Sequence, residues 1–108
     1  MKQTGIKKEK ESDFQSLVIH YVRSRGGYID KIHVSSYQSQ GVPDLQGCYL
    51  GMYIAFETKT PKGRASELQK EKQHQIRMAG GTAEFVKTLK EVEDILDEIF
   101  RIRQDNKS

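Results

Sequence analysis

Apolar residues recur along the chain with two periods, and the period distinguishes helix from strand. A spacing of three to four residues predicts three helices: from Glu11 to the Gly26-Gly27 pair, from a cap at Ser66 to Met78 or Ala79, and from a cap at Thr88 onward. Alternation of apolar and polar positions predicts four strands, at 28–34, 45–50, 52–60 and 82–88. The expected order is α-β-β-β-α-β-α, an α/β domain with a mixed central sheet flanked by helices.

Turn and cap residues set the boundaries of these elements. Gly51 separates the second and third strands and predicts a hairpin, whereas Gly47 within the second strand is a candidate for a bulge. Pro61 ends the third strand. Two capping boxes predict helix starts, Ser66 with Gln69 and Thr88 with Glu91.

Composition places the chain among small proteins that fold as one domain. With 108 residues, 35% hydrophobic and 31% charged, it supports a modest core and leaves no room for a second one. We expect a disordered basic tail over 1–10, a single domain over 11–103 and a short disordered tail over 104–108. A single cysteine, Cys48, excludes an intrachain disulfide and a cysteine-based zinc cluster, and it favours a reducing cytoplasm.

The chain is mildly basic, and its positive charge is unevenly distributed. The formal net charge is +3 and the sequence pI is about 9.0, which is compatible with a nucleic-acid partner. Residues 1–64 hold ten Lys and Arg against six Asp and Glu, whereas 65–108 hold eight against nine. The sequence has no apolar run of the length that spans a bilayer, so we expect no membrane partner.

Three charged residues stand in or beside predicted strands. Asp44 follows Pro43 at the start of the second strand, and Glu57 and Lys59 project from one face of the third, since alternate residues share a face. If the two strands form a hairpin around Gly51, paired residue numbers sum to 101 or 102. Asp44 then lies opposite Glu57 or Thr58, and two carboxylates and an ammonium meet at one end of the sheet.

This combination predicts a site for a hard divalent cation. Two neighbouring carboxylates repel one another unless a cation lies between them, and oxygen ligands suit Mg²⁺ or Mn²⁺. The backbone carbonyl of Thr58 is a further candidate ligand. Lys59 is placed to orient or activate a metal-bound water and to stabilise negative charge in the transition state. Such a site is equipped to hydrolyse a phosphodiester.

The motif also resembles a known family. The stretch GVPDL…IAFETK is similar to the PD-(D/E)xK nuclease superfamily. With ESDFQSLVIHYVRSRGG, FETKTPKGRASELQ and AGGTAEFVKTLKEVEDIL, it resembles the VRR-NUC branch, the virus-type replication-repair nucleases, over about residues 11–97. Small stand-alone members of this branch are typical of phages and prophages. The resemblance implies a restriction-endonuclease-like fold, a metal-dependent endonuclease and, as one activity of the group, cleavage of branched DNA such as Holliday junctions by a homodimer.

The resemblance assigns roles to individual positions. Asp44 and Glu57 match the acidic metal ligands, and Lys59 matches the catalytic lysine. Gln69 matches the glutamine of the helix after the motif, although it is also the expected partner of Ser66 in the capping box. On the first helix, Glu11 matches an acid that often completes the metal site, with Glu9 as a rival and a first-turn role favoured by the helix dipole as the alternative.

The remaining candidates have simpler alternatives beside them. Lys62 and Arg64 lie on a loop that suits DNA phosphates or is merely solvated. Ser35 and Ser36, in the loop before the Pro-Asp pair, are candidate phosphate contacts. Gln15 is expected to be a solvated polar residue. His33 is expected to lie in the strand at 28–34, where a histidine is usually structural.

Four functions fit these observations. The first is a Mg²⁺- or Mn²⁺-dependent DNA endonuclease that is structure-selective and homodimeric, in a bacterial or phage-infected cytoplasm. The second is a nuclease on simple duplex or single-stranded DNA, such as a nicking enzyme. The third is a non-catalytic DNA-binding module with a nuclease fold, against which the intact Asp44, Glu57 and Lys59 argue. The fourth is a subunit that acts with a helicase or another replication and repair partner.

Overall fold

The computed structural model describes residues 3–33, 41–58 and 65–106, with the side chains of the first helix described from Ser12 onward. Their elements, in order, are α1 (Gln3–Ser24), β1 (Tyr28–Lys31), β2 (Leu45–Tyr49), β3 (Met52–Thr58), α2 (Glu67–Met78), β4 (Thr82–Val86) and α3 (Leu89–Asn106). This order confirms the α-β-β-β-α-β-α pattern predicted from the sequence. No helix in the described ranges has the length and apolar character needed to cross a membrane.

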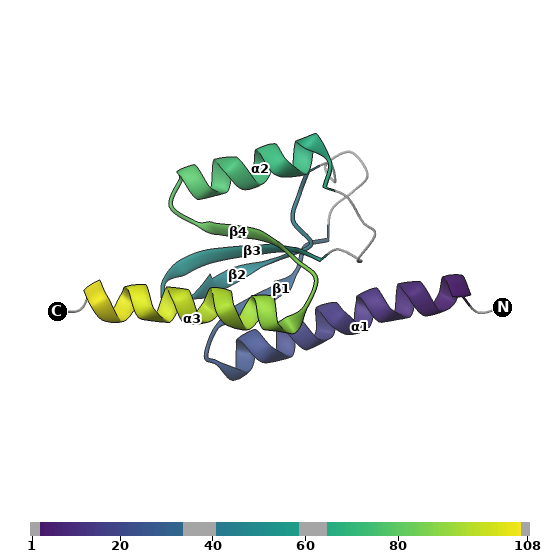
Figure 1. Cartoon of the computed structure of the whole chain (residues 1–108), viewed down its shortest axis with the longest axis horizontal. Helices are drawn as coiled ribbons and strands as arrows, with labels where there is room; N and C mark the ends of the chain where they lie inside the picture. The colour runs from purple at the N-terminus through teal and green to yellow at the C-terminus, as the bar shows by residue number, and fades with distance from the viewer. Residues whose placement is uncertain (1–2, 34–40, 59–64, 107–108) are drawn as a thin grey trace.

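The strands form one mixed sheet in the order β1-β2-β3-β4. The first two pairings are antiparallel, and β4 lies parallel to β3 after the chain crosses over through α2. In Figure 1, α2 covers one face of the sheet, while α1 and α3 lie on the other. The molecule is thus a sheet between two helical layers.

The two faces of the sheet are filled very differently. The α1–α3 face carries the buried apolar cluster, which consists of Val18, Val22, Ile29, Leu45, Tyr49, Ile54, Phe56, Val86, Val92, Leu96 and Ile99. The strand residues that point to the other face, beneath α2, include the small buried residues Ala55 and Ala83 and the buried Glu57. Gln73 of α2 is also buried. Small side chains let α2 pack closely on this face, mainly against β4, which brings a polar helix face to the sheet.

The hairpin between β2 and β3 has the turn that Gly51 predicts. Leu50 and Gly51 both have positive φ, 52° and 82°, as a two-residue type I′ turn requires. The pairing is Leu45 with Phe56 and Tyr49 with Met52, so paired numbers sum to 101 throughout. This register selects one of the two predicted alternatives and places Asp44 opposite Glu57.

The bulge expected at Gly47 is wrong. Gly47 pairs in regular register with Ile29 on one side and Ile54 on the other. A Cβ atom at this position would lie 1.8 Å from the carbonyl oxygen of Tyr28. The glycine therefore permits close approach of β1 to β2, which is the other common reason for glycine inside a strand.

Two helices extend further than the apolar pattern indicates. α1 begins at Gln3, so it includes most of the segment predicted as a disordered tail, and α3 continues past residue 103 to Asn106. Six of the eleven added residues, at 3–10 and 104–106, are Lys, Glu or Gln, whose helix propensity is high although they contribute no apolar stripe. In α3, the Arg101–Asp105 ion pair at 3.0 Å joins this extension to the preceding turn.

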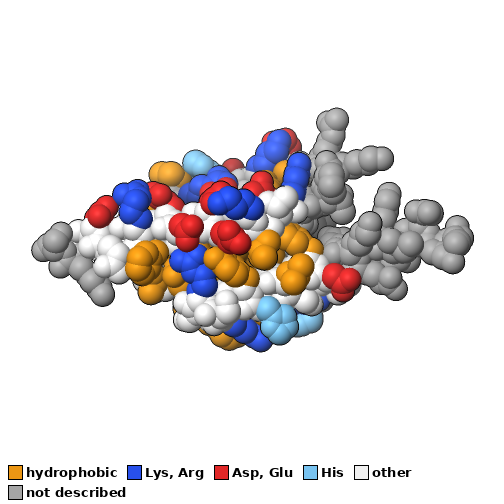
Figure 2. Space-filling view, turned by 60° about the horizontal axis from the view of Figure 1, so that its bottom comes forward, with side chains coloured by type: hydrophobic (Ala, Val, Ile, Leu, Met, Phe, Trp, Pro, Cys, Tyr) orange, Lys and Arg blue, Asp and Glu red, His pale blue; other side chains and the backbone are white. Residues whose placement is uncertain are grey.

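The charges on the α1–α3 side of the molecule are mixed in sign. Figure 2 shows Lys and Arg side chains interspersed with Asp and Glu on this side. Interspersed charges screen one another, so the described side chains in this view form no broad positive surface for DNA.

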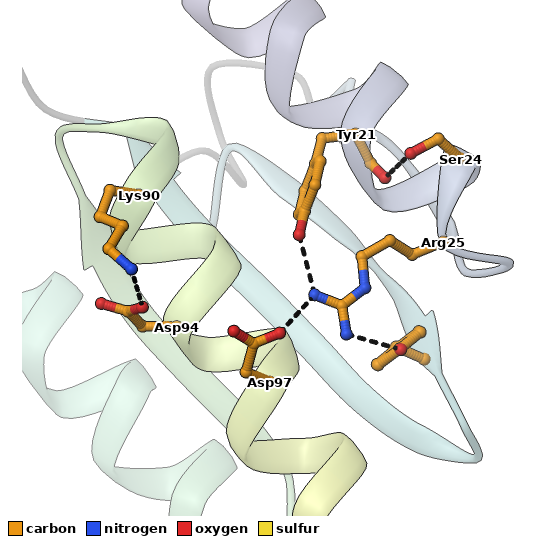
Figure 3. A network of polar contacts seen from close by, with 7 residues as sticks. Tyr21, Ser24, Arg25, Lys90, Asp94 and Asp97 are labelled. Atoms are coloured by element: carbon orange, nitrogen blue, oxygen red, sulfur yellow. Dashed lines mark hydrogen bonds and ion pairs between the residues drawn. The ribbon is translucent and has the colours of Figure 1, made fainter.

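One arginine joins three elements on that side. Arg25, just after α1, donates from Nη1 to the Tyr21 hydroxyl at 2.8 Å and to Asp97 of α3 at 2.7 Å, and from Nη2 to the Tyr49 hydroxyl of β2 at 3.1 Å. Figure 3 shows the guanidinium between α1, α3 and the sheet. Its carbon also lies 5.7 and 5.4 Å from the Tyr21 and Tyr49 ring centroids. Burial lowers the pKa of Arg25, but these hydrogen bonds outweigh it and raise the pKa above its usual value.

Candidate active site

Glu57 is a buried carboxylate on the α2 face of the sheet. Its residue is only 1% exposed, although glutamate is rarely buried unless it is paired or functional. The side-chain amide of Gln69 in α2 donates from Nε2 to Glu57 Oε1 at 3.1 Å. The helix predicted to follow the motif thus contacts the predicted metal ligand.

Gln69 fills both roles that its position suggests. Its Oε1 accepts a hydrogen bond from the Ser66 backbone N–H at 3.1 Å, and its own N–H donates to the Ser66 hydroxyl at 3.1 Å, which completes the predicted capping box. One end of the amide therefore fixes the start of α2 while the other end binds Glu57. The two alternatives are compatible because a glutamine amide has both an acceptor and a donor.

Asp44 is held against the end of β3 by Thr58. The Thr58 backbone N–H donates to Asp44 Oδ2 at 2.8 Å, and the Thr58 hydroxyl donates to the same oxygen at 3.0 Å. Asp44 itself fixes the end of β1, since its carbonyl accepts from the Ile32 N–H at 3.0 Å. The role of the Thr58 carbonyl as a metal ligand remains a prediction. The Thr58 N–H and hydroxyl both donate to Asp44.

Gln15 belongs to this cluster, and the prediction that it is a solvated polar residue is wrong. Its Nε2 donates to Thr58 Oγ1 at 2.7 Å, and the residue is half-buried. Thr58 shares a strand face with Phe56, which faces α1, so a polar residue of α1 meets it there. The signal in the sequence is the spacing of Gln15 from Glu11, one helical turn.

A cavity of about 220 Å³ opens beside Asp44. It is lined by Gln15, Lys31, Ile32, His33, Val42, Pro43 and Asp44. His33 is exposed and lies beyond β1, which ends at Lys31, so its expected place within a strand is wrong. Lys31 and His33 thus border the site, although the sequence motif does not include either of them.

Several predicted site residues lie outside the described residues. These are Lys59, Lys62, Arg64, Ser35 and Ser36. Glu11 lies in α1, one turn before Gln15, but its side chain is also outside the described part. Their roles therefore remain predictions.

The donor set suits a cation that is bound by few protein ligands. No group of three His, Cys, Asp or Glu side chains gathers within the ranges whose side chains are described, 12–33, 41–58 and 65–106. Asp44 and Glu57 are nevertheless neighbours in the hairpin register, since Asp44 precedes Leu45, the partner of Phe56. Mg²⁺ binds through one or two carboxylates and keeps several waters or substrate phosphates. Asp44 and Glu57 fit that mode.

Comparison with solved structures gives a match to this fold. A chain described as a VRR_NUC domain superposes with a TM-score of 0.66 over 82% of this chain and 95% of its own length, at 22% sequence identity. No family model matches the sequence, and no curated protein matches it either. The fold implied by the sequence resemblance is therefore confirmed: the chain has the mixed α/β fold of a VRR_NUC nuclease domain.

Proposed function

We propose that the protein is a metal-dependent endodeoxyribonuclease that hydrolyses phosphodiester bonds and is selective for branched DNA, including Holliday junctions, as a homodimer. The observation that carries the proposal is the pair Asp44 and Glu57. The two acids are neighbours in the register of one hairpin, and each accepts a hydrogen bond, Asp44 from Thr58 and Glu57 from Gln69. A VRR_NUC fold around such a pair supports phosphodiester chemistry.

Mg²⁺ or Mn²⁺ would be held by Asp44 and Glu57, with Glu11 and the Thr58 carbonyl as further ligands. Bound there, the cation would polarise the scissile phosphate and lower the pKa of a coordinated water. Lys59 is proposed to orient the attacking water and to stabilise the developing charge. The burial of Glu57 restricts its movement, which suits a ligand whose geometry must be kept.

The DNA backbone is proposed to approach the end of the sheet where these groups meet. Lys31 and His33 line the cavity beside Asp44 and offer donors to a phosphate next to the scissile one. Lys62, Arg64, Ser35 and Ser36 are proposed as further contacts. The mixed charges on the α1–α3 side (Figure 2) favour this end of the sheet over that side.

Selectivity for branched DNA is proposed to come from geometry. A domain of 108 residues offers little surface for reading a long base sequence, so it reads shape and phosphates. Two copies would hold two active sites at a fixed separation, which suits the two strands of a junction.

The test is cleavage of a matched panel of substrates that share one sequence. The panel contains a four-way junction, a flap, a linear duplex and a single strand, each incubated with Mg²⁺, with Mn²⁺ or with EDTA. We expect paired cuts in the junction with either metal, and none with EDTA. Sedimentation on the same samples is expected to give a dimer with DNA bound.

Other outcomes assign other functions. Equal cutting of all four substrates contradicts branch selectivity and indicates a general or nicking nuclease. Binding without cleavage under every metal condition indicates a non-catalytic module. A monomer on DNA contradicts the homodimer.

Lys31→Ala is expected to weaken DNA binding without changing which structure is preferred. Loss of one phosphate contact should lower the slope of log Kd against log salt concentration by about 1. Affinity is measured by fluorescence anisotropy in a Glu57→Gln background, which prevents cleavage. Lys90→Ala, at an exposed position on α3, is the control and is expected to keep the original slope. An unchanged slope in Lys31→Ala would remove Lys31 from the interface.

A further inference from the structure

We infer that Gln15 is a positioning residue that acts through the Thr58 hydroxyl to fix the Asp44 carboxylate, so that Oδ1 of Asp44 is the oxygen presented to the metal. The inference rests on the proposed function, since it assigns a support to that metal site. It starts from a chain of hydrogen bonds: Gln15 Nε2 to Thr58 Oγ1 at 2.7 Å, and Thr58 Oγ1 to Asp44 Oδ2 at 3.0 Å.

The direction of this chain follows from the chemistry of its members. An ionised carboxylate only accepts, so the single hydroxyl proton of Thr58 points to Asp44. The Thr58 oxygen can then only accept from Gln15, so the Gln15 side chain must be oriented with its amide nitrogen, and not its amide oxygen, toward Thr58. Each bond thus fixes the orientation of the next, from α1 to the carboxylate.

Both bonds from Thr58 to Asp44 reach the same oxygen. The backbone N–H at 2.8 Å and the hydroxyl at 3.0 Å both end on Oδ2. No residue that the structure describes donates a hydrogen bond to Oδ1. Two donors on one oxygen set the rotation of the carboxylate and leave the other oxygen to bind a cation.

The same arrangement occurs at the second acid, from the other side of the sheet. Gln69 of α2 donates to Glu57 Oε1, while Gln15 of α1 reaches Asp44 through Thr58. Each carboxylate is therefore oriented by an amide from a helix on a different face (Figure 1). Outer contacts of this kind orient metal ligands, and their loss typically costs about 10- to 100-fold in metal affinity or activity.

The experiment is a double-mutant cycle that uses Mn²⁺ affinity as its readout. Thr58→Val keeps the shape of the side chain and removes the hydroxyl, and Gln15→Met keeps approximate length and removes the donor. Both keep the backbone N–H and carbonyl of residue 58. We expect each single variant to raise the Kd for Mn²⁺, measured by electron paramagnetic resonance without DNA, by about 10-fold or more.

The cycle separates positioning from mere packing. If Gln15 acts through the hydroxyl, Gln15→Met should change the Kd by less than about 2-fold in the Thr58→Val background, because coupled residues are non-additive. Thr58→Ser keeps the hydroxyl and is expected to restore affinity to within about 3-fold of the original. Circular dichroism spectra and unfolding midpoints check that each variant is folded.

Different failures have different meanings. If the original protein binds Mn²⁺ and cleaves DNA, but the variants bind Mn²⁺ as tightly as the original, the inference is overturned and the proposed function is not. Equal losses from Gln15→Met in both backgrounds would show that Gln15 does not act through Thr58. Original protein that neither binds Mn²⁺ nor cleaves would overturn the proposed function together with this inference.

Discussion

Glu57→Gln is expected to abolish metal-dependent cleavage while the domain stays folded. Glutamine has nearly the same volume as glutamate, so the buried site beside Gln69 is filled, but the negative charge that attracts the cation is lost. A metal ion supplies several kcal/mol of transition-state stabilisation, so its loss lowers kcat/KM by about 10³-fold or more. Asp44→Asn should have the same effect for the same reason.

The measurement is single-turnover cleavage of the preferred substrate, with Mn²⁺ affinity and thermal unfolding followed in parallel. Removing one of two neighbouring carboxylates also removes repulsion, so the metal-free variants should unfold at or above the original midpoint. Full cleavage by either variant would refute the assignment of the metal site. Loss of cleavage together with a large fall in the midpoint would instead indicate that the acid is structural.

Arg25→Met is expected to cause the largest loss of stability among these variants, about 2–3 kcal/mol in the free energy of unfolding. The Arg25 side chain is 22% exposed and donates to the Tyr21 and Tyr49 hydroxyls, which lose a charged donor on substitution. The bond to Asp97 adds less, because the Asp97 side chain is 65% exposed and water competes for it. Methionine retains part of the stem, so the loss reports mainly on the guanidinium.

Chemical denaturation with urea measures this loss. The matched control is Lys90→Met, which breaks the Lys90–Asp94 pair on α3, also visible in Figure 3. That pair is 3.0 Å long, but its side chains are 73% and 60% exposed, so the urea midpoint should not change. Equal effects of the two substitutions would show that Arg25 makes no more than a surface contact.

The part of the site that lies on the hairpin could be predicted because its causes are local. Gly51 accepts a positive φ, and the residue before it follows into a type I′ turn, which fixes the register of β2 on β3. Once the register is known, the pairing of Asp44 with Glu57 needs no tertiary information. The start of α2 was equally predictable, because the capping box is a contact between Ser66 and Gln69, three residues apart.

The contacts from α1 could not be predicted in the same way. Gln15 and Thr58 are 43 positions apart, and their hydrogen bond depends on how the helix packs on the sheet. Apart from its one-turn spacing from Glu11, nothing in the local pattern distinguishes Gln15 from a glutamine that faces water. Gln69 posed the opposite difficulty. Its place in the capping box is a sufficient reason for a glutamine at this position, so the local pattern gives no sign of its hydrogen bond to Glu57. Residues 3–10 show a third limit, because a segment with helix propensity but no apolar stripe resembles a disordered tail in the sequence.

The two amides that orient the carboxylates lie far apart in the order of synthesis. A ribosome that has released residues 1–58 has already exposed both acids, Gln15 and Thr58, but has not yet delivered Gln69 or the strand that makes β3 an interior strand. A nascent or truncated chain that ends before α2 therefore carries the whole acidic pair without the support for Glu57. Under the proposed function, such a chain is expected to bind the cation more weakly than the full chain, because Gln69 is missing from Glu57.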